Sequence, residues 1–452
     1  MKGYFYYHFS SICDIINNIK TRKKVISMKV CVIGLGYIGL PTSAMFAKYN
    51  ADVVGVDIFP EVVDKLNRGE IHIEEPGLEE VIKSVVESGK FRASLTPVEA
   101  EAFIIAVPTP NVDDEYRSCD LKYVISATEA ILPFVKKGNV IIVESTIAPR
   151  TMDDFVVPII ENAGFKVGED VFLSHCPERV LPGQILHELI YNNRIVGGVT
   201  PACAKEGAKV YELFVEGEII QTTARTAEMS KLMENTFRDV NIALANELAK
   251  VCNDLEIDVV DVIQMANKHP RVNLHHPGPG VGGHCLAVDP HFIVSKSPDL
   301  AKIIKLSRDT NESMPAYVVE QIKELVVGIE NPKIAAFGAT YKGNVDDMRE
   351  SPAMDVINLL MDQGIEVTLH DPHVNSISEK YQFITAKEST DGADLIVVLT
   401  DHDEFKTMNY NVLAEKMNRA MLFDTRNCID KNVAVCDKVE MINFGNLYQF
   451  LK

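Results

Sequence analysis

No stretch of this 452-residue sequence reaches 18 uninterrupted apolar residues, so a helix that crosses a membrane is not expected. Low-complexity tracts are also absent. With 46% hydrophobic and 24% charged residues, the composition is that of a folded protein rather than a disordered or fibrous one. The length exceeds what one hydrophobic core usually serves, which predicts two or three domains.

Positive charge is scarce in the chain. Lys and Arg number 45 against 64 Asp and Glu, and the formal net charge is -19. Such a surface repels nucleic acid phosphates and anionic lipids, so we expect neither a nucleic acid nor a membrane as a partner. Any anionic ligand must therefore bind in a locally basic pocket.

The 9 cysteines form no C-x-x-C motif and no paired framework. In a chain of this length, scattered cysteines favour reduced thiols over a disulfide scaffold, and reduced thiols favour a cytoplasmic location.

The first segment, residues 1–27, has no periodic apolar face. Its basic cluster, residues 21–24, follows a mixed run, whereas a secretory signal carries its positive charge before a continuous apolar run. We expect a dispensable N-terminal tail, or an upstream start with Met28 as the functional beginning.

Short apolar runs alternate with helical patterns from Met28 onward. The runs are residues 29–33, 51–56, 102–107 and 139–143. Strands that alternate with helices predict a parallel sheet with helices on both faces. Ligands of such sheets bind beyond the carboxyl ends of the strands, where Asp57, Thr109 and Thr146 fall.

A glycine motif, Gly34-x-Gly36-x-x-Gly39, follows the first run directly. Gly34 permits a tight turn, Gly36 lets the backbone approach a pyrophosphate, and Gly39 allows close packing of helix on strand. Asp57, 23 positions after Gly34, is placed to accept from a ribose 2′-hydroxyl and to repel a 2′-phosphate, which selects NAD over NADP. The alternative is a sheet that keeps its glycines for packing alone.

A degenerate copy of the same unit follows residue 332. Strands are predicted at residues 333–337, 366–370 and 394–399, with a helix capped by Ser351 and running to Gln363. The triple glycine is missing, so this copy should hold something other than a dinucleotide. The predicted fold is α/β, with two Rossmann-like doubly wound domains joined by a long central helix. The domains expected after the tail are a Rossmann domain for NAD at 28–222, a helical domain at 223–328 and a second, Rossmann-like domain at 329–452.

The central helix is predicted to begin near Thr226. Seven apolar residues share one stripe of it, namely Met233, Phe237, Val240, Leu244, Leu248, Val251 and Leu255. Such a stripe most commonly packs into a core, and the alternative is a bridge between domains or a dimer contact. Lys231, Asn235 and Arg238 share another face, which spacing alone would assign to a solvated edge.

Residues 277–290 form a glycine-rich loop that carries Cys285, four positions before Asp289. A cysteine in such a backbone-exposed loop is set up for nucleophilic attack on a carbonyl group, with His284 or a lysine supplying positive charge. Two alternatives compete. Cys285 is a buried space-filler, or it joins His275, His276 and His284 as a zinc ligand. No second cysteine sits at zinc-finger spacing, so we expect no metal.

Four separated motifs together resemble the UDP-glucose/GDP-mannose dehydrogenase family over residues 28–452. They are residues 34–39, 176–179, 231–241 and 278–290. Residues 231–241 and 282–290 are most similar to the branch that oxidises UDP-N-acetyl-D-mannosamine, because the UDP-glucose branch carries serine where His284 stands. His291 and Arg426 depart in small ways from that branch.

The resemblance implies a set of binding residues and a homodimer paired through the long helix. The residues implied to meet NAD are Gly34, Gly36, Tyr37, Ile38, Gly39, Asp57, Thr109, Thr146 and Arg349. Those implied to hold the UDP-sugar are Arg179, Val180, Lys231, Asn235, Arg238, His269, Arg271, Gly282, Tyr341, Lys342 and Arg426. Arginines and lysines suit a pyrophosphate, which needs forked donors.

The implied reaction is a four-electron oxidation of carbon 6 of the sugar. Lys231 favours the developing alkoxide, Cys285 adds to the aldehyde, and water activated near Asp289 or Glu178 hydrolyses the resulting thioester, with Asn235 as a further catalytic residue. The alternative substrates are UDP-N-acetylglucosamine and UDP-glucose. The rival functions are a one-hydride hydroxyacid or sugar-phosphate dehydrogenase, and a nucleotide-sensing protein without turnover.

Overall fold

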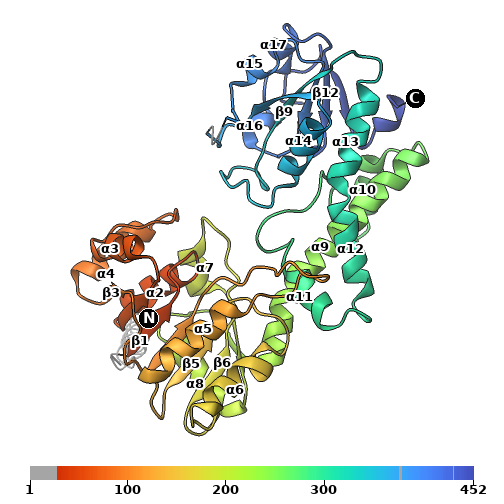
Figure 1. Ribbon diagram of the computed structural model, residues 1–452. Helices are drawn as coiled ribbons and strands as arrows, with labels where there is room; N and C mark the ends of the chain where they lie inside the picture. The colour runs from red at the N-terminus through yellow and green to blue at the C-terminus, as the bar shows by residue number, and fades with distance from the viewer. Residues whose placement is uncertain (1–27, 376–378, 431, 452) are drawn as a thin grey trace, which may run out of the picture. The chain divides into compact units, whose positions relative to one another are not determined.

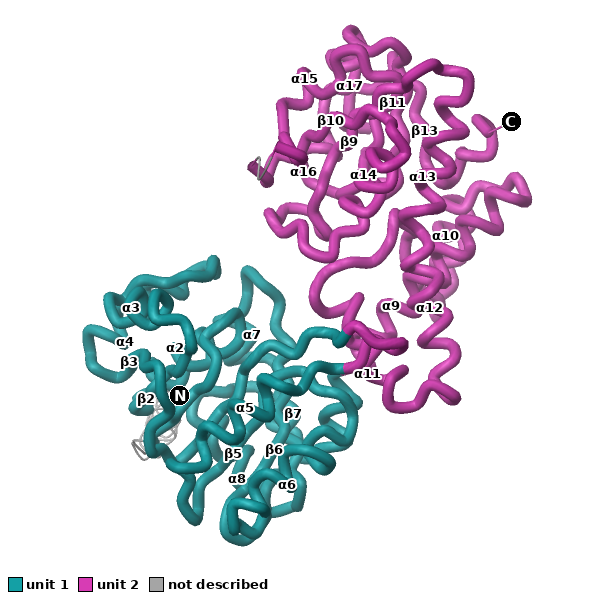
Figure 2. Tube along the Cα trace, in the orientation of Figure 1, with its two compact units in different colours: residues 1–112, 119–231 teal, residues 113–118, 232–452 magenta. Residues whose placement is uncertain are grey.

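A computed structural model describes residues 28–375, 379–430 and 432–451. The tail predicted at residues 1–27 lies outside the described residues. The chain divides into two compact units (Figure 2): unit 1 is residues 1–112 with 119–231, and unit 2 is residues 113–118 with 232–452. Of the helices described, none combines the length and apolarity that a membrane crossing requires.

Unit 1 is built on a sheet in which eight described strands follow the order β3-β2-β1-β4-β5-β6-β7-β8 (Figure 1). The strands are β1 (Lys29–Ile33), β2 (Asp52–Val56), β3 (Phe91–Ser94), β4 (Ala102–Ile105), β5 (Val140–Val143), β6 (Phe172–His175), β7 (Arg194–Gly198) and β8 (Ile219–Thr223). Neighbouring strands are parallel except β6 and β7, which pair antiparallel. The predicted parallel sheet is confirmed.

Both faces of this sheet are covered by helices. The helices are α2 (Gly39–Lys48), α3 (Pro60–Asn67), α4 (Leu78–Glu87), α5 (Lys122–Ile131), η1 (Leu132–Phe134), η2 (Met152–Val156), α6 (Val157–Asn162), α7 (Ile185–Tyr191) and α8 (Pro201–Tyr211). Along β1, Val30 and Val32 pack against α2, α4 and α7, while Cys31 and Ile33 pack against α5, η2 and α6. Apolar residues at every position therefore reflect burial on both sides.

Unit 2 contains a second sheet, with the order β10-β9-β11-β12-β13 and every neighbouring pair parallel. Its strands are β9 (Lys333–Phe337), β10 (Glu366–His370), β11 (Leu395–Val398), β12 (Met421–Asp424) and β13 (Glu440–Asn443). Its helices, together with the long helix that begins in unit 1, are α9 (Ala224–Asp254), α10 (Val259–Ala266), α11 (Asp289–Lys296), α12 (Lys302–Glu312), α13 (Met314–Leu325), α14 (Pro352–Asp362), α15 (Ala386–Ser389), α16 (Asp403–Lys406), α17 (Tyr410–Ala414) and η3 (Leu447–Gln449). One face packs on α13 and α14, and the other on α16 and α17. The two Rossmann-like sheets and the long helix confirm the predicted fold class.

The apolar stripe of α9 does not pack into a hydrophobic core. The interpretation of the stripe as core, which is the commoner one for such a pattern, is therefore wrong. Met233, Phe237, Leu244, Val251 and Leu255 are between 41% and 66% exposed, and Phe237 is the most exposed of them. The buried face of α9 carries small side chains and buried polar groups instead. Among these are Ala243, Ala249 and Cys252, together with Asp239 and Asn246, which bond to α12. Small residues let the neighbouring helix approach, and the large apolar residues face outward.

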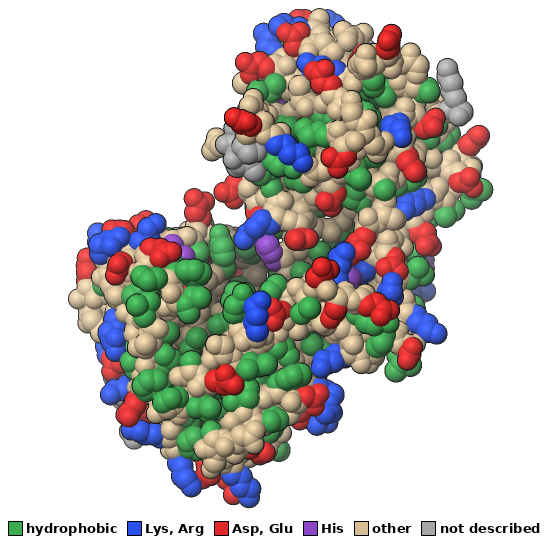
Figure 3. All heavy atoms as spheres, viewed as in Figure 1, with side chains coloured by type: hydrophobic (Ala, Val, Ile, Leu, Met, Phe, Trp, Pro, Cys, Tyr) green, Lys and Arg blue, Asp and Glu red, His purple; other side chains and the backbone are tan. Residues whose placement is uncertain are grey.

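Charge is spread over both units. On the face drawn in Figure 3, acidic and basic side chains are interspersed. The net charge of -19 is therefore not gathered into a single acidic patch on that face.

Candidate functional site

The glycine loop of unit 1 has the geometry that a dinucleotide requires. Gly34 has a φ of 92°, and a side chain there would also meet the Ala106 carbonyl group. A Cβ at Gly39 would overlap the Gly34 carbonyl oxygen, whereas a Cβ at Gly36 would meet no described heavy atom within 4 Å. Packing explains Gly34 and Gly39 but not Gly36, so packing alone does not account for the motif. Exposed backbone at Gly36, next to the amino end of α2, suits a pyrophosphate.

Asp57 lies directly after β2 and is held by backbone donors. Its Oδ2 accepts from the Leu35 N–H at 3.1 Å, and its Oδ1 accepts from the Phe59 N–H at 3.1 Å. This fixes a carboxylate beside the glycine loop, where a ribose hydroxyl can donate to it. Ile58 and Phe59 beside it are exposed, as is Tyr37 in the loop. The first two were not singled out from the sequence, although apolar residues after a strand-end acid would have been the signal.

Thr109 and Thr146 lie together at the carboxyl edge of the same sheet. The Thr109 hydroxyl donates to the Thr146 carbonyl oxygen at 2.6 Å. Ser145 joins the same strand ends, because its hydroxyl accepts from the Val107 N–H at 2.9 Å and donates to the Val107 carbonyl at 2.8 Å. The two predicted NAD residues thus follow β4 and β5, and hydrogen bonds join the segments after these two strands. β4 is the neighbour of β1 in the sheet.

In the turn at residues 176–179, the carboxylate of Glu178 pairs with the buried Arg194. Glu178 Oε2 accepts from Arg194 Nη2 at 2.7 Å, and Glu178 Oε1 accepts from the Arg179 N–H at 2.9 Å. Cys176 is buried, and burial raises the pKa of its thiol to about 12, so it is not a nucleophile. Sequence reasoning missed Arg194, because a lone arginine at the start of a strand carries no motif.

Lys231 and Asn235 lie four residues apart on α9 and do not form a solvated edge. Lys231 is buried and Asn235 is half-buried. Only Arg238 of the three is exposed, as a solvated edge of the helix would require. Asn235 Nδ2 donates to Asp289 Oδ2 at 2.6 Å. Burial lowers the pKa of His175 to about 3, with a smaller contribution from the charge of Lys231, so this histidine is neutral.

The cysteine loop of unit 2 leads into α11, and Cys285 lies on it with its side chain exposed. Its carbonyl oxygen accepts from the N–H groups of Val288 at 3.1 Å and Asp289 at 2.9 Å. The Asp289 side chain is buried at the first turn of α11. The alternative of a buried space-filler is therefore wrong for Cys285.

The same loop packs on the segment that follows β9. Gly283 donates to the Glu350 carbonyl at 3.2 Å, and a Cβ at Gly283 would lie 2.7 Å from a ring carbon of Tyr341. A Cβ at Gly282 would overlap the Glu350 carbonyl oxygen. Three predicted substrate residues are thus placed near one another in unit 2, because Arg426 also reaches this loop: a Cβ at Gly278 would lie 2.7 Å from its Nη1.

Other predicted residues of unit 2 lie on its surface. Arg349 donates to both carboxylate oxygens of Asp347, at 2.9 and 2.8 Å. Lys342 is exposed on the same segment. His269 and Arg271 are exposed after α10, where His269 Nδ1 accepts from the Arg271 N–H at 3.3 Å.

The second sheet repeats the strand-end acid of the first. Asp371 Oδ2 accepts from the Ala339 N–H at 2.8 Å, and its Oδ1 accepts from the His373 N–H at 2.9 Å, as Asp57 does in unit 1. Unlike Asp57, however, Asp371 also contacts a histidine, because His402 Nε2 lies 3.0 Å from Asp371 Oδ2. The Asp371 carboxylate is thus paired with a buried histidine of the same unit.

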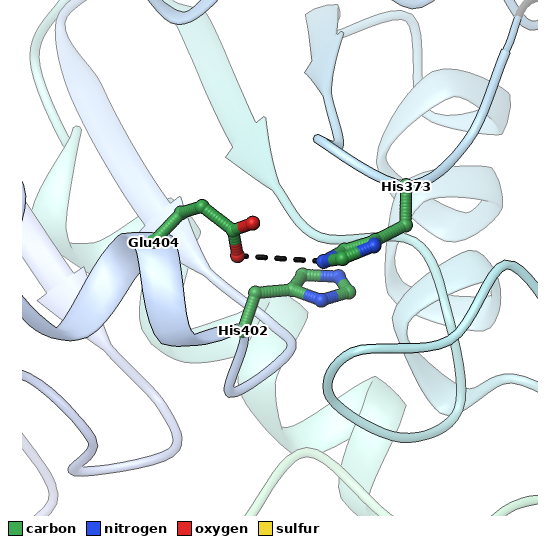
Figure 4. A group of neighbouring side chains, drawn as sticks. All are labelled: His373, His402 and Glu404. Carbon is green, nitrogen blue, oxygen red and sulfur yellow. Dashed lines mark hydrogen bonds and ion pairs between the residues drawn. The ribbon is translucent and has the colours of Figure 1, made fainter. Parts of the chain in front are cut away.

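His373, His402 and Glu404 form a group with potential metal ligand atoms within 4.8 Å of one another (Figure 4). Both nitrogens of His402 are engaged, because Nδ1 accepts from the Asn344 N–H at 2.9 Å while Nε2 faces Asp371. The group therefore offers two ligands rather than three. The residues of the zinc alternative, His275, His276, His284 and Cys285, are not among the grouped ligands of the described chain.

These features define an NAD-dependent dehydrogenase. Unit 1 has the loop for a dinucleotide, unit 2 has an exposed cysteine in a loop beside its sheet, and the long helix carries a buried lysine. Three models of one family match the chain: the NAD binding domain at residues 28–215, the central domain at 225–313 and the UDP binding domain at 335–431. The chain belongs to the UDP-glucose/GDP-mannose dehydrogenase family. NAD is its cofactor.

Several similar proteins are named for the same substrate. The chain is 50% identical over 414 residues to a UDP-N-acetyl-D-mannosamine dehydrogenase of Methanococcus maripaludis, which covers 90% of this chain and 94% of that protein. It is 46% identical over 400 residues to the enzyme of that name from Escherichia coli, covering 84% and 95%. The solved structure of the UDP-N-acetyl-mannosamine dehydrogenase Cap5O from S. aureus is 57% identical, with a TM-score of 0.87, covering 94% of this chain and 100% of that one.

Proposed function

We propose that this chain oxidises UDP-N-acetyl-D-mannosamine to UDP-N-acetyl-D-mannosaminuronate, with two NAD and one water consumed per sugar. The relatives named for this substrate support the proposal, since they match nearly the whole chain at 45–50% identity. The full set of NAD and UDP-sugar residues implied by the family resemblance is part of it. The division into domains at 28–222, 223–328 and 329–452 is proposed as well.

NAD, when bound, accepts one hydride in each of the two oxidations. In the first, carbon 6 loses a hydride while its hydroxyl loses a proton, and the ammonium of Lys231 stabilises the developing alkoxide. The Cys285 thiolate then adds to the aldehyde carbon, and the oxygen takes up a proton to give a thiohemiacetal. Loss of a second hydride and of that proton gives a thioester.

Hydrolysis of the thioester completes the reaction. Water adds to the carbonyl carbon, the carbon–sulfur bond breaks, and the thiolate of Cys285 is regenerated as the carboxylate forms. Glu178 or Asp289 accepts the first proton that water gives up, and the second passes to solvent as the carboxylate forms. Asn235 holds the Asp289 carboxylate by the 2.6 Å hydrogen bond.

One observation carries this mechanism: Cys285 is exposed in a loop whose backbone is fixed to Asp289, and Asp289 is itself fixed to Asn235. A dehydrogenase that transfers one hydride has no use for this arrangement. A held nucleophile is what a reaction through a covalent intermediate needs.

The test is anaerobic incubation of the protein with NAD and a panel of UDP-sugars, with NADH counted by absorbance and the product identified by mass. Two NADH per UDP-N-acetyl-D-mannosamine and a product carrying a carboxylate are expected. One NADH per sugar, with an aldehyde or ketone as product, would refute the four-electron reaction.

We also propose that two copies pair through the exposed stripe of α9. Phe237, Leu244 and Val251 present large apolar surfaces on one side of the helix, and burying them in a second copy is favourable by about 25 cal/mol per Å². Phe237→Glu should give a monomer by light scattering, while Glu247→Gln on the same helix should keep the dimer. An unchanged mass for Phe237→Glu would contradict this pairing.

A cytoplasmic location is proposed on the grounds of the scattered cysteines. Eight of them, in the described part of the chain, form no disulfide with one another. Thiols kept in this state suit a reducing compartment.

A further inference from the structure

A buried carboxylate of unit 1 holds a loop that comes much later in the sequence. Glu75 lies between α3 and α4 and is 6% exposed. Its Oε2 accepts from the Gly183 N–H at 2.8 Å, and its Oε1 accepts from the Ile185 N–H at 2.8 Å. Burying a carboxylate is costly unless it is well bonded. The use of both oxygens on one short segment, 108 and 110 residues away, therefore calls for a reason.

The position of Glu75 is set by the core on either side of it. Ile73 and Leu78 are buried in the same core cluster as Ile185 and Leu189 of α7. The Glu75 carbonyl oxygen also accepts from the Leu78 N–H at 3.2 Å, at the start of α4. The carboxylate therefore reaches the loop from a packed segment, and this segment fixes its direction.

The backbone donors of the exposed loop that leads into α7 are all used. The Leu181 N–H donates to Glu188 Oε2 at 2.8 Å, and the Gln184 N–H donates to the Leu181 carbonyl at 3.1 Å. Pro182 has no N–H, and the other two donors are those that Glu75 binds. Carboxylates thus accept from three of the four donors. The backbone of the loop is held by acceptors outside it rather than by secondary structure of its own.

The loop begins with two residues that we propose to hold the UDP-sugar, Arg179 and Val180. Both are half-buried, and Val180 packs against the core cluster that contains α7. The Arg179 guanidinium donates to the Asn193 carbonyl, and its own carbonyl accepts from Asn192 Nδ2 at 3.5 Å. A loop that is fixed before its ligand arrives loses less conformational freedom on binding, so its rigidity favours affinity.

Capping of α7 alone does not explain what Glu75 does. Gln184 is the N-cap residue of α7, and its side chain makes no capping bond. A Ser, Thr or Asp at that position would cap the helix locally. Such a cap would leave the Gly183 N–H, which lies outside α7, without the acceptor that Glu75 provides. Gly183 has a φ of 89°, so Glu75 holds the loop at its left-handed residue as well as at the start of the helix.

We propose that Glu75 is a positioning residue for the substrate, which fixes the backbone of this loop and so presents Arg179 and Val180 in the conformation that binds the UDP-sugar. This rests on the proposed function, in which these two residues hold the UDP-sugar. Glu75 should then contribute affinity for the sugar nucleotide rather than chemistry. Its loss should weaken binding of the UDP-sugar far more than it slows the reaction of the bound complex.

Glu75→Gln is the test, because the amide keeps the shape of the side chain but turns an NH₂ group toward a backbone donor. The KM for UDP-N-acetyl-D-mannosamine should rise by about 10- to 100-fold, the scale on which a displacement of about 1 Å acts. The kcat and the KM for NAD should change by less than about threefold. The Kd for the same sugar, measured by calorimetry without NAD so that no turnover occurs, should rise with the KM.

Two single variants frame this result. Glu75→Asp keeps the carboxylate but is one methylene shorter, so it should reach one of the two N–H groups and give an intermediate Kd. Glu74→Gln, at the exposed neighbouring position, is the matched control and should leave the Kd and both KM values unchanged.

A local cap separates positioning from helix stability. Adding Gln184→Asp to Glu75→Gln gives α7 a cap of its own, so hydrogen exchange of the α7 peptide should return toward the wild-type rate. The raised Kd for the UDP-sugar should persist in this double variant. Recovery of the Kd together with the exchange rate would show that Glu75 acts through helix stability alone, and would overturn the proposal.

The wild-type protein tests the proposed function separately, through two NADH per sugar and a measurable Kd. A wild-type protein that binds no UDP-sugar would refute both the proposed function and the role of Glu75. Normal binding by the wild type with an unchanged Kd for Glu75→Gln would refute the role of Glu75 alone. If Glu75→Gln does not fold, the same measurements are made on Glu75→Asp, and an unchanged Kd there would equally overturn the proposal.

Discussion

Replacement of Arg308 by methionine should strongly destabilise unit 2. Arg308 Nη1 donates to Asp239 Oδ1 at 2.6 Å and joins α12 to α9, with side chains that are 2% and 0% exposed. Removing one partner of a buried ion pair leaves an uncompensated charge and costs about 3–5 kcal/mol. Lys305→Met on the same helix breaks an exposed pair with Asp309 and should cost about 0–1 kcal/mol.

The pair itself is imperfectly satisfied, which gives a second expectation. Arg308 Nε and Asp239 Oδ2 are buried without a hydrogen-bond partner in the described part of the chain. Replacing both residues by apolar ones, as in Asp239→Leu with Arg308→Met, should therefore cost much less than the single change. Asn311 keeps its hydrogen bond to the Asp239 carbonyl at 3.0 Å in that double variant.

Hydrogen exchange read by mass spectrometry is the appropriate assay, because two units need not unfold together and the sequence has no tryptophan. A loss of 3–5 kcal/mol corresponds to faster exchange of α9 and α12 peptides by about 10²- to 10⁴-fold, since every 1.4 kcal/mol is tenfold. Exchange of Arg308→Met no faster than that of Lys305→Met would refute the reasoning. So would a double variant as unstable as the single one.

Two further predictions concern the chemistry. Cys285→Ala should abolish formation of the uronate while NAD and the UDP-sugar still bind, as calorimetry would measure, and two NADH per sugar from this variant would contradict the covalent mechanism. Asp57→Ala should relax the preference for NAD over NADP, because it removes both the ribose acceptor and the charge that repels a 2′-phosphate. The control is Asp64→Ala on the exposed side of α3, and equal cofactor preference in the two variants would place the selectivity elsewhere.

The seven strands that were predicted have their bounds right to within one or two residues, but β3, β6, β7, β8, β12 and β13 were not predicted. β9 and β10 have the predicted bounds, and β4 ends two residues before its apolar run does. Strands buried on both faces are short apolar runs that end at glycine or a polar residue, so their limits are visible in the sequence. The helix of the second copy starts at Pro352 as expected, but the Ser351 hydroxyl makes no capping bond.

The surroundings of these elements were less predictable. Periodicity places the stripe of α9 on one side of the helix, but it does not say whether that side meets the core or the outside. Its buried side is made of alanines and of the polar pairs with Arg308 and Asn311, which lie 65 or more residues away in sequence. In the same way, Glu144 and Arg194 belong to no motif and meet only through strand order. Contacts between distant residues decide both features.

The choice of sugar is the prediction with the widest consequence. An N-acetyl group at carbon 2 brings an amide that needs both room and hydrogen bonds, so a site built around it leaves polar partners unpaired when a hydroxyl replaces it. Inversion at carbon 2 directs the same amide to the opposite face of the ring, where those partners are absent. Unpaired buried polar groups cost about 1–3 kcal/mol each.

UDP-N-acetyl-D-mannosamine should therefore exceed UDP-N-acetylglucosamine and UDP-glucose in kcat/KM by at least about 100-fold, which corresponds to about 2.7 kcal/mol of transition-state stabilisation. The three sugars are compared under one set of conditions with saturating NAD, and the products are identified by mass. Competition between two sugars in one reaction is the control, because it measures the ratio of kcat/KM directly. Comparable values for UDP-N-acetylglucosamine would assign the protein to that substrate and would leave the cofactor and the role of Cys285 unchanged.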